Sequence, residues 1–271
     1  MINYIVTSHN SEGHIAMVLS ALMQVRKSPT NPIYCVLDGC TDGTESVVRR
    51  YPVKIITTPD VYEMRCLNIA FREIPQPDDG LNFILQDDVV LTDPDTEMKI
   101  DWLYRLFPGL GIVGMRHGFN LPDDALTSGE QVPSCDKIEN DHNIPGFRLP
   151  GYAQLANGCF TYRQMIYKSP IVIPCKVVNT LGGYDERFAP TAHDDTEFAM
   201  RACRAGFKNG IVAIDVCQPM DWRGSSSAPV DFTKLHIEHM NLIRELYPDL
   251  LRELGHARPS TLEMRLWPSR F

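Results

Sequence analysis

Residues 81–88 read Leu81-Asn-Phe-Ile-Leu-Gln-Asp87-Asp88, an apolar run that ends in two adjacent carboxylates. Similar short runs, rich in apolar and β-branched residues, lie at residues 2–7, 33–37 and 53–57. Stretches with helical spacing of their apolar residues follow the first three runs, at about 12–25, 44–49 and 62–73. Strands that alternate with helices are typical of a mostly parallel, Rossmann-like sheet with helices on both faces. The sequence therefore predicts an α/β fold.

Polar residues follow three of the four predicted strands. They are Ser8-His9-Asn10, Asp38-Gly39 and Asp87-Asp88. In open sheets of this kind, ligands bind beyond the carboxyl ends of the strands. The three clusters together predict a ligand site at this edge of the sheet.

A second acidic pair lies about a hundred residues further on. The turn Leu181-Gly-Gly-Tyr-Asp-Glu-Arg-Phe188 leads to Asp194-Asp195, and a helical run follows the pair at once. Carboxylates at a helix start are stabilised by its unpaired N–H groups and its dipole, and so remain ionised. One acidic site at a strand end and another at a helix start indicate a metal–phosphate site beside a general base. This combination predicts an enzyme.

Composition narrows the class of protein. The 271 residues suit one large domain or two closely fused halves. A net charge of −8 argues against nucleic acid as a partner, since such binding needs a basic face. The eight Cys form no C-x-x-C pair, which favours a reducing, cytoplasmic location. No apolar run approaches the ~20 residues of a membrane span, which leaves peripheral contact with a membrane surface open.

The second half of the chain is less regular. From about residue 116 to 156 many Pro, Gly and Asp residues predict a long irregular segment, and strand-like runs return at 171–174 and 211–214. An apolar stripe from Phe232 to Leu246 predicts a helix that ends before Pro248. We expect a nucleotide-binding half at 1–110, an acceptor-binding and catalytic half at 111–230, and a C-terminal helix and tail at 231–271.

The motifs, taken together, resemble family 2 glycosyltransferases of the GT-A fold over roughly residues 3–225. Six segments stand in the order of that family: Ile5-Val-Thr-Ser-His-Asn10, Val36-Leu-Asp-Gly-Cys-Thr-Asp-Gly-Thr44, Arg65-Cys-Leu-Asn-Ile-Ala70, Ile84-Leu-Gln-Asp-Asp88, Gly182-Gly-Tyr-Asp-Glu-Arg-Phe188 and Asp194-Asp-Thr-Glu-Phe198. The resemblance implies a Rossmann-like nucleotide-sugar domain with a fused acceptor-binding half.

The resemblance also implies roles for individual residues. Ser8, His9 and Glu12 would line the pocket for base and ribose, Asp38 would accept a hydrogen bond from the base, and Arg65 would lie near the base or phosphates. Asp87 would contact the ribose or the metal shell. Asp88 would bind a divalent cation, and Asp195 would be the catalytic base.

Two departures from the family pattern concern the metal. Gln86 stands where many members carry a further Asp, so one carboxylate is missing. The late His that often binds the metal is not evident either. Asp221 lies near its expected place and is the proposed substitute, while His236 and His239 are weaker candidates because they lie on the apolar stripe of a helix.

The function implied is a metal-dependent glycosyltransferase. Mn²⁺ or Mg²⁺ would offset the charge of a departing nucleoside diphosphate. A single carboxylate base would activate a glycan or other acceptor hydroxyl, with inversion. A sugar-phosphate nucleotidyltransferase is an alternative, but Thr7-Ser-His-Asn-Ser-Glu12 lacks the Gly-rich basic loop that it needs. A non-catalytic nucleotide- or glycan-binding relative is a third reading, favoured by Gln86 and opposed by the carboxylates at 38, 88 and 195.

Overall fold

The computed structural model describes residues 1–121, 140–142, 152–167, 169–218, 231–256, 259 and 263–268. The first four predicted strands are present as β1 (Ile2–Ser8), β2 (Ile33–Asp38), β3 (Lys54–Thr58) and β4 (Leu81–Gln86). The helices between and after them are α1 (Ile15–Val25), α2 (Thr44–Val48), α3 (Glu63–Glu73) and α4 (Thr96–Leu106). These strands pair in parallel in the order β3-β2-β1-β4.

The sheet continues without a break into the second half of the chain. The added strands are β12 (Ile171–Pro174), β6 (Leu110–Gly114), β13 (Lys208–Val212), β10 (Cys159–Tyr162) and β15 (Met264–Arg265). The full order is β15-β10-β13-β6-β12-β4-β1-β2-β3. Only β12 and β10 run against the other seven strands, which confirms the mostly parallel sheet.

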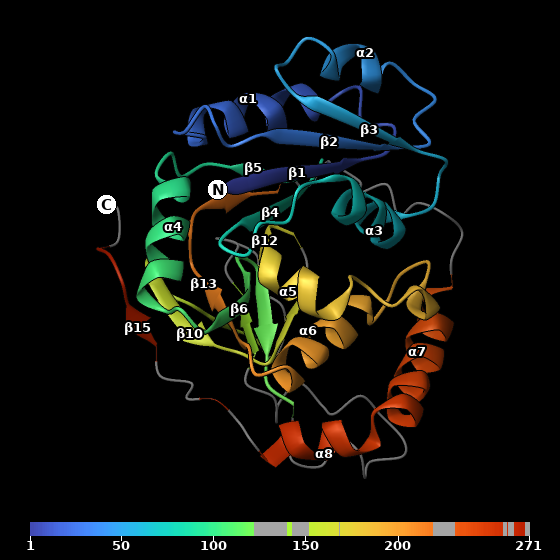
Figure 1. Ribbon diagram of the computed structural model, residues 1–271, viewed down its shortest axis with the longest axis vertical. Helices are drawn as coiled ribbons and strands as arrows, with labels where there is room; N and C mark the ends of the chain where they lie inside the picture. Colours follow the sequence, from blue (N-terminus) through green and yellow to red (C-terminus); the bar gives the residue numbers. More distant parts are fainter. Residues whose placement is uncertain are drawn as a thin grey trace.

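Two smaller sheets and five further helical segments complete the described chain. One small sheet contains β7 (His117–Phe119), β8 (Asn140–His142), β9 (Tyr152–Gln154) and β11 (Met165–Tyr167), and the other pairs β5 (Val90–Leu91) with β14 (Val216–Cys217). The helical segments are α5 (Cys175–Leu181), η2 (Glu186–Phe188), α6 (Asp194–Arg204), α7 (Phe232–Leu246) and α8 (Pro248–His256). In Figure 1, α1 and α2 lie at the top of the view, above β2 and β3. Helix α7 lies at the lower right, and α8 lies at the bottom, below α6.

The central sheet separates two apolar cores. Alternation along β1 sends Ile5 to one side, where α3, α5, α6 and the C-terminal helices pack. Tyr4 and Val6 point to the other side, against α1 and α4. The same alternation recurs at Ile84 against Phe83 and Leu85 of β4. Because both faces are covered, the strands read as continuous apolar runs, and only their ends carry polar residues.

A pair of hydrogen bonds joins α3 to the Gly-Gly turn of the second half. The Asn68 side-chain nitrogen donates to the Tyr184 carbonyl at 2.9 Å, and the Tyr184 N–H donates to the Asn68 oxygen at 2.8 Å. Gly183 has φ +95°, and a Cβ there would lie 2.6 Å from the same Asn68 oxygen. The glycine therefore serves both a left-handed backbone and a close approach.

The buried Glu197–Arg201 pair on α6 supports this turn from the opposite side. Arg201 donates to the carbonyls of Leu181 and Gly183 at 3.0 and 2.8 Å. Glu197 accepts hydrogen bonds from Arg201 and from the Tyr247 hydroxyl. Glu197 is therefore committed to the structure of the turn.

The structure adds elements that the sequence pattern did not reveal. Leu110–Gly114 is a central strand, and part of the segment expected to be irregular forms β7, β8 and β9. Pro248 starts a further helix at its first position, where a missing N–H costs nothing. The expected tail contributes β15 to the sheet edge. The sheet crosses the expected boundary at residue 110, and the division into halves stays a prediction.

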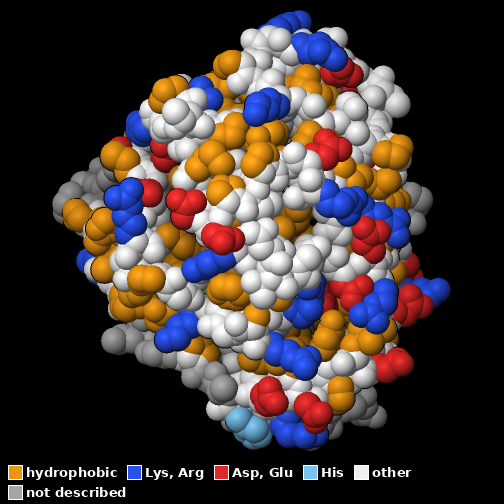
Figure 2. All heavy atoms as spheres, viewed as in Figure 1, with side chains coloured by type: hydrophobic (Ala, Val, Ile, Leu, Met, Phe, Trp, Pro, Cys, Tyr) orange, Lys and Arg blue, Asp and Glu red, His pale blue; other side chains and the backbone are white. Residues whose placement is uncertain are grey.

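The surface and the helices agree with the composition. On the face shown in Figure 2, Lys and Arg side chains are interspersed with Asp and Glu. None of the described helices combines the length and the apolar character that a membrane-spanning helix needs.

We predict that Asn68→Ala lowers the free energy of unfolding by about 3 kcal/mol, because it leaves the buried N–H and carbonyl of Tyr184 unsatisfied. Urea denaturation measures this change. Asn241→Ala, on the exposed side of α7, is the matched control and should stay within about 0.5 kcal/mol of wild type. We call the two hydrogen bonds between Asn68 and Tyr184 the Asn68 clamp. Equal stability of the two variants would show that this clamp does not stabilise the contact between α3 and the Gly-Gly turn.

Candidate functional site

The ligand edge of the sheet centres on β1 and β4. The chain passes from β1 to β2 and β3 on one side, and then crosses to β4 on the other side of β1. Ligands in open α/β sheets bind at such a switch point. Thr7 and Gln86 are register partners at its carboxyl edge. The predicted residues Ser8, His9, Asp38, Asp87 and Asp88 all follow or end strands at this edge.

Asp38 fixes the loop that leads into α3. Its Oδ1 accepts hydrogen bonds from the Thr58 hydroxyl at 2.7 Å and the Val61 N–H at 2.8 Å, and its Oδ2 accepts from the Tyr62 N–H at 2.9 Å. Gly39, with φ +54°, lets this loop approach, since a Cβ there would lie 2.4 Å from Cβ of Asp60. Asp38 therefore holds the floor of the expected base site, and its contact with a nucleotide stays a prediction.

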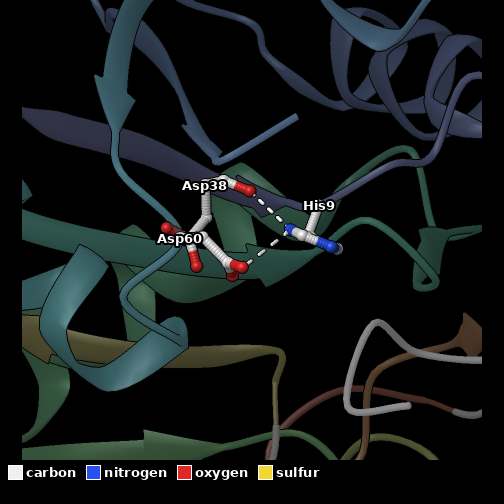
Figure 3. Close-up of side chains that lie close together, drawn as sticks. All are labelled: His9, Asp38 and Asp60. Atoms are coloured by element: carbon white, nitrogen blue, oxygen red, sulfur yellow. Dashed lines mark hydrogen bonds and ion pairs between the residues drawn. The ribbon is translucent and has the colours of Figure 1, made fainter. Parts of the chain in front are cut away.

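Nδ1 of His9 faces both the Asp38 carbonyl oxygen and the Asp60 carboxylate (Figure 3). Its Nδ1 is 2.5 Å from the Asp38 carbonyl oxygen and 3.8 Å from the Asp60 carboxylate. Ligand atoms of these three side chains lie within 4.8 Å of one another, so among the described residues they form a group that can hold a metal ion. The short contact to the Asp38 carbonyl places a proton on Nδ1, which favours a hydrogen-bonding role over metal binding in this arrangement.

Asp87 and Ser8 lie beside this group. Asp87 Oδ2 accepts a hydrogen bond from the His9 N–H at 3.1 Å, and the Ser8 hydroxyl contacts that of Ser11. Burial raises the pKa of Asp87 above its usual value, and hydrogen bonds from Ser8, His9 and Ser11 offset part of that rise. These hydrogen bonds hold the Asp87 carboxylate beside the end of β1.

Asp88 is the carboxylate best suited to a cation. Its side chain is buried, and its Oδ1 has no hydrogen-bond partner among the described residues. Its Oδ2 accepts a hydrogen bond from Gln218 at 2.6 Å. A buried carboxylate oxygen without a partner is costly unless a ligand satisfies it. This oxygen fits a Mn²⁺ or Mg²⁺ ligand.

A buried arginine that the sequence pattern did not reveal is joined to Asp88 through the Gln218 side chain. Arg116 donates to Gln218 Oε1 at 2.5 Å and to the Ser169 carbonyl at 3.2 Å. Burial lowers the pKa of Arg116, and the Asp88 charge opposes that shift. Arg116 follows β6, so it reaches the same edge as Asp88. The apolar run Leu110–Met115 that ends in a cation was the signal that could have revealed it.

The second acidic pair lies in the first turn of α6, as predicted for a helix start. The Tyr184 hydroxyl donates to Asp195 Oδ1 at 3.4 Å. Burial, followed by the charges of Asp195, Asp194 and Glu63, raises the pKa of Tyr184 well above its usual value. Tyr184 therefore stays protonated and orients the Asp195 carboxylate. The Asn68 clamp and the Asp195 side chain are thus linked through one residue.

Histidines from α7 support the turn before Asp194. Ala192 and His193 both have positive φ, 76° and 62°. His239 Nδ1 lies 2.8 Å from the Ala192 carbonyl oxygen, and the rings of His193 and His236 lie 4.2 Å apart. His239 is a buried core residue, and His236 packs on His193.

Glu12 and Arg65, two other predicted site residues, have partners outside this group. Glu12 accepts a hydrogen bond from the Gly43 N–H at 3.0 Å, and so braces the neighbouring loop. Arg65 pairs with Glu186 of η2 at 3.4 Å, on the side of the second half. Asp221 lies outside the described residues.

Comparisons with known proteins bear on this arrangement. No protein-family model matches the chain, and no curated protein matches it in sequence. Among solved structures, S. aureus TarS 1–349 in complex with UDP-GlcNAc has a TM-score of 0.58 and 14% identity, with 89% of this chain and 65% of that chain covered. A Pyrobaculum calidifontis mannosyltransferase, PcManGT, in complex with GDP-Man and Mn²⁺, has a TM-score of 0.55 and 16% identity, with 94% and 72% covered.

This chain has the GT-A fold. The α/β class and the architecture expected from the motifs are thereby confirmed. The chain spans between 39% and 65% of the length of the TarS chains that it matches. At identities of 14–17%, these similarities establish the fold alone.

We predict that His193 makes the protein less stable in acid. Burial, with the nearby His236, His239 and Arg244, lowers the pKa of His193 to about 3 from 6.5. The unfolded chain then binds a proton near pH 6.5 that the native state refuses, so stability falls as the pH drops below that value. Urea denaturation at pH 7 and pH 5 should show a loss about 2 kcal/mol smaller for His193→Asn than for wild type.

Asparagine is the appropriate replacement because it tolerates the positive φ at this position. An identical pH dependence in the variant and wild type would contradict a buried, neutral His193.

Proposed function

We propose that this protein is a metal-dependent glycosyltransferase that moves a sugar from a nucleoside-diphosphate donor to an acceptor hydroxyl, with inversion. The observation that carries the proposal is the placement of Asp88 and Asp195. Asp88 lies at the sheet edge with a buried oxygen that lacks a partner, and Asp195 lies at a helix start, oriented by Tyr184. The GT-A fold and the nucleotide-sugar complexes of TarS and PcManGT support it.

The residues present fit a divalent cation. Asp88 would bind it directly, and the neighbouring Asp87 would contribute to its shell or hold the ribose. The ion, Mn²⁺ or Mg²⁺, supplies electrostatic stabilisation of the diphosphate leaving group. PcManGT was solved with Mn²⁺. Arg116, buried beside Asp88, adds a fixed positive charge on the same side, which offsets the negative charge that a diphosphate brings.

The nucleoside would lie along the ends of β1 and β2. Asp38 and the backbone that it holds form the expected contact with the base. Ser8 and His9 lie next to the expected ribose, and both are fixed by the hydrogen bonds around Asp87. Glu12 and Arg65 would act at the periphery, the first through the loop at Gly43.

Asp195 would take the proton of the acceptor hydroxyl as that hydroxyl attacks the anomeric carbon. A hydroxyl is a weak nucleophile, so a carboxylate within hydrogen-bond reach is needed as attack proceeds. One base on the face opposite the leaving group suffices for inversion. The Tyr184 hydroxyl donates a long hydrogen bond, of 3.4 Å, to one oxygen of this carboxylate and favours one orientation of it. We propose a glycan or another hydroxyl compound as the acceptor.

The two alternative functions fare less well. A nucleotidyltransferase would need a basic, Gly-rich loop after β1, and the loop there presents His9 and Asn10 between carboxylates. A non-catalytic relative would have no need for a buried Asp88 oxygen without a partner, or for a carboxylate at Asp195.

The first test of the proposal concerns the cation. A thermal-shift screen of UDP and GDP, with and without Mn²⁺, should show stabilisation by one nucleotide that depends on the ion. Asp88→Asn should abolish this Mn²⁺-dependent shift while leaving the melting temperature of the free protein nearly unchanged, because asparagine keeps the shape of the side chain and its oxygen can still accept the hydrogen bond from Gln218. The matched control is Asp101→Asn, because the Asp101 side chain is about half exposed. Asp93 does not serve as a control, because its buried side chain pairs with Lys99.

A variant of Asp88 that binds nucleotide with unchanged Mn²⁺ dependence would contradict the metal assignment. Absence of any nucleotide effect on wild type would contradict the proposed function as a whole.

The second test separates binding from chemistry. Asp195→Asn should bind the donor as wild type does and lose transfer by roughly 10²–10⁴-fold, the usual cost of a missing general base. Release of nucleoside diphosphate from the donor sugar, followed over time, measures this loss. Near-normal turnover would assign the base to Asp194, because Glu197 is occupied by Arg201 and Tyr247.

A further inference from the structure

Glu63, the first residue of α3, has no role in the site described above. Its Oε1 accepts a hydrogen bond from the Thr7 hydroxyl at 3.1 Å, and its Oε2 accepts one from the Gln86 amide at 2.5 Å. Thr7 and Gln86 are register partners on β1 and β4. The Glu63 carboxylate therefore lies directly over the switch point of the sheet.

The same carboxylate also faces the catalytic side of the site. Glu63 is one of three carboxylates, with Asp194 and Asp195, whose charges act on the Tyr184 hydroxyl. Asp88 follows Gln86 by two residues at the end of β4. Glu63 thus contacts Gln86, the residue before Asp87-Asp88, and its charge acts on the same Tyr184 hydroxyl that donates to Asp195.

Two neighbouring groups hold Glu63 in this place. The loop before it carries positive φ at Asp60 and Tyr62, 50° and 69°. Asp38 holds that loop through the N–H groups of Val61 and Tyr62. At the other end, the Gln86 backbone N–H donates to the Ser169 hydroxyl at 2.7 Å, which fixes the strand end beneath the amide.

The hydrogen bond to Glu63 explains why an amide suits position 86. A carboxylate at position 86 would repel Glu63, whereas an amide donates a hydrogen bond to it. The strand end has no carboxylate at position 86. Glu63 at the start of α3 supplies one instead, at the far side of the hydrogen bond from the Gln86 amide.

We propose that Glu63, positioned by Gln86 and Thr7, binds hydroxyl groups of the donor sugar and so determines which sugar is accepted. This inference rests on the proposed function. A sugar that passes from a diphosphate at Asp88 to a hydroxyl at Asp195 must lie between these two residues. Glu63 contacts Gln86 near the first of them, and its charge acts on the hydroxyl of Tyr184, which donates to the second. A carboxylate accepts hydrogen bonds from two adjacent hydroxyls at once, and bonds to a charged group are the stronger kind. The substrate class is a nucleotide sugar with adjacent unsubstituted hydroxyls.

Calorimetric titration in Mn²⁺ tests the proposal with four probes: UDP, UDP-GlcNAc, GDP and GDP-mannose. In wild type, one nucleotide sugar should bind more tightly than its own diphosphate. Glu63→Gln keeps the shape and removes the charge. It should raise the Kd of that nucleotide sugar about tenfold, which is ~1.4 kcal/mol, and change the Kd of the diphosphate less than twofold.

Glu73→Gln, at the exposed far end of the same helix, is the matched control and should leave all four Kd values unchanged. The melting temperature of the free Glu63→Gln protein reports its folding independently of ligand. An equal loss of affinity for the diphosphate and for the nucleotide sugar would overturn the proposal, because Glu63 would then contribute to nucleotide binding or to folding. Unchanged binding of the nucleotide sugar would also overturn it. If wild type bound none of the four probes, the proposed function itself would fail, a result distinct from both.

Discussion

The hydrogen bonds between the Asn68 amide and the Tyr184 backbone are the constraint on which the site depends. They tie α3, which packs against β1 and β2, to the Gly-Gly turn that precedes Asp195. The start of α3 is tied down by Asp38 through the loop at Val61 and Tyr62. One helix, held at its start and at its middle by polar side chains, therefore sets the distance between the strand-end carboxylates and the expected base. Apolar packing alone would leave that distance less defined, because it is non-directional.

The charges at the sheet edge suit the ligand that we propose, a nucleotide sugar with a divalent cation. The buried Asp88 and Arg116 are bridged by the Gln218 amide, which donates to one and accepts from the other. Glu63 supplies a carboxylate where the strand end has Gln86. Burial of such groups costs free energy unless each finds a partner. The Asp88 oxygen without one marks the point where a cation would lower the free energy most.

Much of this arrangement could be predicted from the sequence, and the rest could not for physical reasons. The runs ending at Ser8, Asp38 and Gln86 gave correct strands because each is buried on both faces and stops at a polar residue. The fold class followed from their alternation with helices. Arg116 and Glu63 were missed because their importance arises from pairing between strands and from a helix start distant in sequence. Local periodicity does not report such contacts. The assigned roles of His9, Glu12, Arg65 and the metal and base carboxylates stay predictions, and Asp221 lies outside the described residues.

We infer that one nucleotide sugar lies across the ends of β1 and β4, between Asp88 and Asp195. A crystal structure of the protein with Mn²⁺ and the nucleotide sugar that binds most tightly would show where the donor lies. We expect the cation and diphosphate against Asp88, with Arg116 nearby, and the sugar beside Glu63 facing Asp195. A nucleotide bound elsewhere, or a sugar pointing away from α3 and α6, would contradict it.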